Sequence, residues 1–165
     1  APSLVGSEMC IRDRVKRITS DNRSGSFVGS EFAYEDLGSQ ELEKYKDRKY
    51  LRKEACPNNN ELECHVISRV PTEKSSGYKY QVLWLDDTAA HKVWKIDYFD
   101  RKGSHLKTLF FDDYKIYLDK HWRPSVYKMI NHQTGKSTDL LVQNIRFKVG
   151  LSSRDFNPKS LSRAR

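Results

Sequence analysis

The sequence predicts a mainly β domain with a minor helical part, built on an antiparallel sheet. Aromatic residues make up 12% of its 165 residues, and aromatic and β-branched side chains favour strands. From residue 62 onward, short stretches of alternating apolar and polar residues are separated by turn signals. Because no long helical stretch lies between them, crossovers between parallel strands are excluded, and the sheet is expected to be antiparallel.

The first third of the domain is predicted to hold a short strand and a helix. Residues 26–34 predict the strand, with a bulge at Gly29. Residues 39–53 predict the helix, because Ser39 is a suitable N-cap and apolar residues follow it at helical spacing. The alternative for residues 49–53 is the beginning of a strand.

The rest of the chain predicts a succession of strands bounded by turn-forming residues. The expected strands cover residues 63–70, 78–85, 92–99, 106–111, 114–118, 123–132 and 137–149, and a short turn or helix follows at 152–161. Trp94, Ile96 and Tyr98 stand at alternate positions, so they are predicted to share one face of the sheet. This alternation predicts one apolar face and one face in contact with water.

Residues 1–14 are predicted to be unstructured and foreign to the domain, of which residues 15–165 are the C-terminal portion. Within this segment, residues 8–13 (EMCIRD) resemble the read-through translation of a transposase adaptor used to prepare DNA sequencing libraries. On this interpretation, the true start of the domain and any signal peptide are lost by truncation. The alternative is a native N-terminal segment.

The charge pattern favours a solvated surface over a dedicated site for a polyanion. A net charge of +8 permits attraction to nucleic acid or to an anionic lipid surface. However, Lys and Arg are mixed with acidic residues along the chain. Residues 78–80 and 114–117 only faintly suggest the paired aromatics of an RNA-binding sheet, so nucleic acid is not an expected partner.

The sequence carries no recognisable catalytic or cofactor motif. It contains no GxSxG, GxGxxG or phosphate-binding loop, and its five histidines stand outside metal-ligand spacing. Two carboxylate pairs, Asp86 with Asp87 and Asp112 with Asp113, fall beside turns, where such side chains usually hydrogen-bond the backbone. The sequence therefore predicts a non-enzymatic binding protein without a metal or a cofactor.

Cys56 and Cys64 flank the loop signal PNNN and are predicted to face each other across a hairpin. Cys10 falls in residues 1–14, so the other two cysteines form an even pair. An even pair fits a disulfide formed in an oxidising compartment. Two free thiols are the alternative.

Five stretches of the sequence form a specific set, although each alone is weak. They are GSFVGSEFAYEDL (25–37), SGYKYQVLWLD (76–86), KVWKIDYFDRKGSHLKTLFFDDYK (92–115), NHQTGKSTDL (131–140) and GLSSRDFNPKSL (150–161). Together they resemble the outer membrane lipoprotein-sorting proteins of the LolA-like class, over nearly everything from residue 15 onward. Members of that family are longer at the N-terminus, and this departure fits truncation.

The resemblance implies an incomplete β-barrel, which is a strongly curved antiparallel sheet with helix packed on its concave side. It also implies a periplasmic, non-enzymatic carrier of lipoprotein acyl chains or another lipid, with a lipid-exporting inner-membrane transporter as a partner. The candidate cavity residues on the apolar sheet face are Trp84, Trp94, Ile96, Tyr127, Met129 and Leu141. Ordinary core packing is the alternative for each. The alternative function is a protein-interaction module of an envelope transport complex, or a module for an anionic surface, without a lipid cavity.

Overall fold

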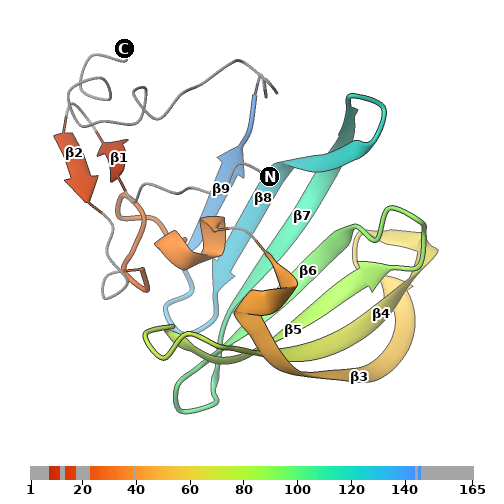
Figure 1. The fold of residues 1–165 in the computed structure, drawn as a ribbon, viewed down its shortest axis with the longest axis horizontal. Coiled ribbons are helices and arrows are strands. Elements are labelled where there is room, and N and C mark those ends of the chain that lie inside the picture. Colours follow the sequence, from red (N-terminus) through yellow and green to blue (C-terminus); the bar gives the residue numbers. More distant parts are fainter. Residues whose placement is uncertain (1–7, 12–13, 18–22, 39, 144, 146–165) are drawn as a thin grey trace.

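The computed structural model describes residues 8–11, 14–17, 23–38, 40–143 and 145 (Figure 1). Its elements are β1 (Glu8–Ile11), β2 (Arg14–Arg17), the 3-10 helices η2 (Tyr34–Leu37) and η3 (Leu42–Lys44), β3 (Tyr45–Cys56), β4 (Asn59–Pro71), β5 (Tyr78–Asp86), β6 (Val93–Asp100), β7 (His105–Tyr117), β8 (His121–Asn131) and β9 (Ser137–Leu141). Strands β3 to β9 form one antiparallel sheet in sequence order, and β1 pairs with β2 in a separate sheet. No helix in the described part of the chain is long and apolar enough to cross a membrane.

The predicted curved, antiparallel and mainly β architecture is confirmed. The seven strands of the large sheet follow one another as a meander, and the sheet curves without closing, so that β3 and β9 form its two edges (Figure 1). The strands predicted at 106–111 and 114–118 are a single strand, β7. The strand predicted at 137–149 ends at Leu141, and the turn or helix predicted at 152–161 lies outside the described residues.

The helix predicted at residues 39–53 is wrong. Three of these residues form η3, and the stretch from Tyr45 onward is the first half of β3. β3 pairs with β4 along its whole length, through Tyr45 opposite Pro71 at one end and Cys56 opposite Asn59 at the other. This pairing outweighs the helical propensity of the Lys- and Glu-rich sequence, which is only a weak influence on its own.

Residues 26–34 do not form the predicted strand. Ser26 and Ala33 make an isolated β-bridge, and the chain between them turns back through Gly29, whose φ of +72° suits glycine. The turn delivers Phe32 and η2 onto one face of the large sheet. Among the described residues, the 3-10 turn η2 is what packs on this face, where the resemblance implied a helix.

The expectation that residues 1–14 are unstructured is wrong for Glu8–Ile11. These four residues form β1, and they pair with β2 in the register Glu8 opposite Arg17 and Ile11 opposite Arg14. The adaptor origin of residues 1–14 stays a prediction.

A β-bulge in β6 separates two side chains that the alternation predicts to lie together. Trp84 of β5 pairs with Lys95, whereas the next residue, Leu85, pairs with Val93. Trp94 is therefore the extra residue of the bulge, and its side chain turns to the face opposite that of Ile96. The prediction that Trp94 shares a face with Ile96 and Tyr98 is wrong, because alternation cannot reveal one inserted residue.

Candidate functional site

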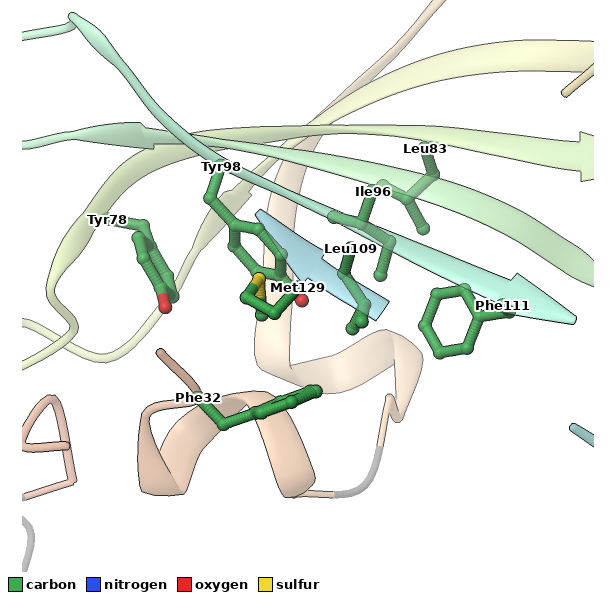
Figure 2. Close-up of a cluster of buried hydrophobic side chains, with 8 residues drawn as sticks. All are labelled: Phe32, Tyr78, Leu83, Ile96, Tyr98, Leu109, Phe111 and Met129. Carbon is green, nitrogen blue, oxygen red and sulfur yellow. The ribbon is translucent and has the colours of Figure 1, made fainter. Parts of the chain in front are cut away.

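One face of the large sheet, which we call the inner face, is the face that Phe32 covers. Its buried side chains come from four adjacent strands, and they are Tyr78, Leu83, Ile96, Tyr98, Leu109, Phe111 and Met129. Ile96 pairs with Leu83 and with Leu109, and Leu109 pairs with Met129, so these residues make a continuous row across the sheet. Figure 2 shows the ring of Phe32 lying against this row, on the side of the helical turn.

The buried carboxylate of Asp36 binds the segment that contains Phe32 to the sheet. Asp36 of η2 accepts hydrogen bonds from the backbone N–H of Ala33 (2.6 Å), the Nζ of Lys107 (2.7 Å) and the Oη of Tyr78 (2.5 Å). The Asp36 side chain is fully buried, and the Lys107 side chain is 6% exposed. Lys107 also donates to the backbone carbonyl of Glu31 (3.1 Å). We call residues 31–37 the covering segment. Lys107 of β7 therefore holds this segment at both ends, through the carbonyl of Glu31 and the carboxylate of Asp36.

A second carboxylate fastens the same segment to the turn before β5. Glu35 accepts hydrogen bonds from the Oγ of Ser76 (2.8 Å) and the backbone N–H of Gly77 (2.9 Å). Burial raises the pKa of the Glu35 carboxyl, and these hydrogen bonds oppose that rise only in part. A Cβ at Gly77 would stand 3.0 Å from the Glu35 carboxylate and 3.1 Å from the Cβ of Ser24, so a side chain here would require these neighbours to shift by a few tenths of an ångström.

Beside Glu35 lies a small cavity of about 90 Å³. Its charged and polar lining residues are Arg23, Glu35, Lys44, Tyr45, Thr72, Glu73, Ser76 and Gln81, and Gly38 and Pro71 complete the wall. Arg23 and Glu73 form an ion pair of 2.8 Å across its exposed side. The cavity holds about three waters by volume and is therefore too small for a long acyl chain.

We expect two buried tyrosines of the inner face to respond oppositely to loss of the hydroxyl. Tyr78 donates to the Asp36 carboxylate, whereas the hydroxyl of Tyr98 has no hydrogen-bond partner among the described residues. Tyr78→Phe should therefore lower the free energy of unfolding by about 1.5–3 kcal/mol, the range for a hydrogen bond to a charged group. Tyr98→Phe should leave it unchanged or raise it. Urea unfolding of both variants checks this, and equal losses would contradict it.

The same pair predicts sensitivity to alkali. Burial, and then the charge of Asp36, raise the pKa of Tyr78 and of Tyr98 well above the ordinary value for tyrosine. A raised pKa means that the stabilisation is complete below about pH 10 and is lost as the pH rises further, because only the unfolded chain ionises readily. Unfolding followed between neutral and strongly alkaline pH should show this loss, and each Phe variant should make it smaller.

The opposite face carries a second buried group, which we call the outer cluster. Its members are Cys56, Cys64, Val66, Val82, Trp84 and Trp94. Cys56 and Cys64 are joined by a disulfide between β3 and β4, with 4.9 Å between their Cα atoms. The Nε1 of Trp84 donates to Glu54 (2.6 Å), and the ammonium of Lys95 lies 4.0 Å from the centre of the Trp84 ring. These polar contacts shield the apolar cluster from solvent.

Asp86 closes the outer cluster at the end of β5. Its side chain is fully buried and accepts hydrogen bonds from the Oγ1 of Thr88 (2.6 Å), the backbone N–H of Lys92 (3.1 Å) and the Nε1 of Trp94 (3.1 Å). Burial alone would raise the pKa of the Asp86 carboxyl, but these donors outweigh it and hold the pKa below its ordinary value. The carboxylate is therefore a structural anion that holds the bulged end of β6.

The six candidate cavity residues do not lie together in the structure. Ile96 and Met129 lie in the inner-face core, and Tyr127 packs against that core while remaining partly exposed. Trp84 and Trp94 belong to the outer cluster, so a cavity shared by all six residues is wrong. Leu141 is 63% exposed, whereas its neighbour Leu140 pairs with Tyr127 and packs on the inner face.

Sequence reasoning missed the residues that hold the cover in place. Phe32, Asp36 and Lys107 are as deeply buried as the core aliphatics, yet a lone acidic residue and a lone lysine carry no pattern that marks them as partners. One weak signal was available: Lys107 stands at an apolar-face position of an alternating strand, between Leu106 and Thr108. A charged residue at such a position indicates a buried partner.

Comparison with known proteins places the chain in a family. A family model described as that of an uncharacterized protein matches residues 11–163. No curated protein matches the chain. Among solved structures, the chain is similar to a domain described as that of an outer membrane lipoprotein-sorting protein, from Vibrio parahaemolyticus, with 50% identity and a TM-score of 0.80 over 90% of this chain.

Two further solved structures share the fold. A DUF1329 family protein from Desulfovibrio piger ATCC 29098 matches at 25% identity with a TM-score of 0.77 over 90% of this chain. A LolA superfamily protein from Nitrosomonas europaea matches at 16% identity with a TM-score of 0.58 over 89% of this chain. The chain spans 61%, 60% and 66% of the lengths of the three structures, respectively. The family model covers residues 11–163, so the chain belongs to the family that this model describes, and the similarity to the Vibrio domain confirms the resemblance to the outer membrane lipoprotein-sorting proteins of the LolA-like class.

Proposed function

We propose that this protein is a non-enzymatic, periplasmic carrier that holds an acyl chain of a lipoprotein or another lipid on the inner face of its sheet. Similarity to the lipoprotein-sorting domain from Vibrio parahaemolyticus supports a role in sorting. The observation that carries the proposal is the nature of the inner face, where an apolar row across four strands is covered by a short segment that contributes Phe32, with Phe27 and Leu37 packed beside it.

An acyl chain would lie along this row in the place that Phe32 occupies. Ile96 and Met129 would contact it at the centre, with Tyr127 and Leu140 at the partly exposed end. Each buried methylene contributes about 0.8 kcal/mol, so eight methylenes would give about 6 kcal/mol before the costs of ordering the acyl chain and displacing Phe32 are subtracted. Met129 suits this role because its flexible side chain adapts to different apolar shapes.

The disulfide and the family together support a periplasmic location. Cys56 and Cys64 pair within one hairpin, and such bonds persist in oxidising compartments such as the periplasm. A carrier in that compartment requires a donor of its lipid, and the proposed donor is a lipid-exporting transporter of the inner membrane. The residues that would contact this transporter are not assigned.

Titration with a fluorescent fatty-acid analogue tests the proposal, and two neighbouring leucines provide a matched pair. Leu140→Asp places a charge on the inner face, whereas Leu141→Asp places it on an exposed position one residue away. We expect saturable binding that is insensitive to salt, because burial of apolar surface drives it. Leu140→Asp should weaken binding by about tenfold or more, and Leu141→Asp by less than about twofold.

Circular dichroism of each variant shows whether it is folded. If the unmodified chain binds no acyl ligand saturably, or if both substitutions weaken binding equally, the acyl-carrier proposal fails. The protein-interaction module without a lipid cavity is then the better interpretation.

A further inference from the structure

We propose that η3 and β3 form a docking edge for the surface of an anionic phospholipid membrane. This edge is a second binding surface, separate from the inner face, and it does not depend on an acyl ligand. β3 is the first strand of the large sheet, and its outer side has no neighbouring strand among the described residues (Figure 1).

Positive charge is concentrated on this edge. Residues 42–53 include six Lys or Arg and two Asp or Glu. Arg52 pairs with Glu54, and Lys53 pairs with Glu63 and Asp87. Three other cations of the edge form no ion pair with any described residue, and they are Lys46, Arg48 and Lys49. All three are exposed, so their charge is available to an external anion.

Large apolar side chains are exposed among these cations. Leu42 of η3 is 64% exposed, and Tyr50 and Leu51 of β3 are 62% and 45% exposed. Lysines alone on a sheet edge are explained by protection against pairing with another sheet, but that role needs no exposed leucine or tyrosine. Basic residues interspersed with tyrosine and leucine instead suit the membrane interface, where the cations contact phosphate groups and the apolar side chains enter the acyl boundary.

The same strand connects the docking edge to the rest of the molecule. β3 pairs with β4 throughout, and Tyr45 at its start stacks under the guanidinium of Arg69, 3.4 Å from the ring centre. Backbone pairing, interrupted by three register shifts, therefore attaches the edge to the sheet. An acidic surface on a protein partner would attract the same cations, and a failure to bind anionic vesicles would favour such a partner over a membrane.

Flotation of the full chain with lipid vesicles tests the inference. We expect binding to vesicles that contain phosphatidylglycerol and weak or no binding to vesicles of phosphatidylcholine alone. The variant Lys46→Glu/Arg48→Glu/Lys49→Glu should reduce the affinity for anionic vesicles by about tenfold or more. The control Lys102→Glu/Lys120→Glu/Lys136→Glu changes the net charge equally at exposed positions on other turns, and should reduce it by less than about threefold.

A second pair of variants tests the apolar contribution. Tyr50→Ser/Leu51→Ser should remove the part of vesicle binding that survives high salt, and Leu118→Ser, at another exposed leucine, should not. Equal binding to neutral and anionic vesicles, or equal losses in the two charge-reversed variants, would overturn the inference. The acyl-ligand titration is independent of both variants, so failure here and failure of the proposed function can be told apart.

Discussion

Lys107→Met is expected to lower the free energy of unfolding by about 3–5 kcal/mol, because it leaves the buried carboxylate of Asp36 without its cationic partner. Methionine keeps the length and most of the apolar contacts of the lysine stem. The loss is therefore due mainly to the unpaired charge. Urea unfolding measures it as a fall in the midpoint with an unchanged slope.

The control for this prediction lies on the same strand. Lys115 pairs with Asp113 at 3.2 Å, but both side chains are more than half exposed, so Lys115→Met should cost about 1 kcal/mol or less. Adding Asp36→Asn to Lys107→Met should recover part of the loss, since the remaining buried group is then neutral. A Lys107→Met variant as stable as Lys115→Met would show that the buried pair does not hold the covering segment.

Asp86→Asn is expected to destabilise the opposite side of the sheet by about 3–5 kcal/mol, again because one partner of a buried charged pair is removed. The substitution removes the negative charge that faces the ammonium of Lys92 at 3.6 Å and weakens the hydrogen bonds from Thr88 and Trp94. Asp87→Asn is the matched control. Its carboxylate is exposed and pairs only with Lys53 among the described residues, so about 1 kcal/mol or less is expected.

The pH dependence distinguishes Asp86 from a merely well-packed residue. Its pKa is lowered in the folded protein, so its stabilisation is present above the ordinary aspartate pKa and is lost as the pH falls through the lower folded value. The unmodified protein should therefore lose stability in acid more steeply than Asp86→Asn does. Thermal unfolding of both proteins between neutral pH and about pH 3 measures the difference, and parallel curves would contradict the assignment.

The sequence predicts the sheet well where a single physical signal decides the structure. From β4 to β8, alternation of apolar and polar residues and the intervening turn residues predict the strands, with β7 divided in two, and β9 is predicted at its start. The same reasoning fails for residues 39–53, because their spacing and composition favour a helix in isolation. Pairing with β4 determines their structure instead, and that partner lies beyond any local window.

The candidate site is predicted only in part, for two physical reasons. Ile96 and Met129 were identified because they follow the alternation into the inner face. Alternation places Trp94 on the wrong face, because the β-bulge in β6 reverses the direction of its side chain and no sequence pattern reveals the bulge. Phe32 and Asp36 were missed because their importance comes from contacts with distant strands.

The contacts of the covering segment also determine when it can form during folding. Each neighbouring pair of strands in the meander is joined by a short turn and closes a small loop. In contrast, the segment contacts Lys107 across 71 residues from Asp36, and Asn131 and Thr138 across 100 and 107 residues from Glu31. Closing such long loops has a higher entropic cost, so the hairpins can assemble while the apolar row is still open. We therefore expect the hairpins of the sheet to form before the covering segment packs on the inner face.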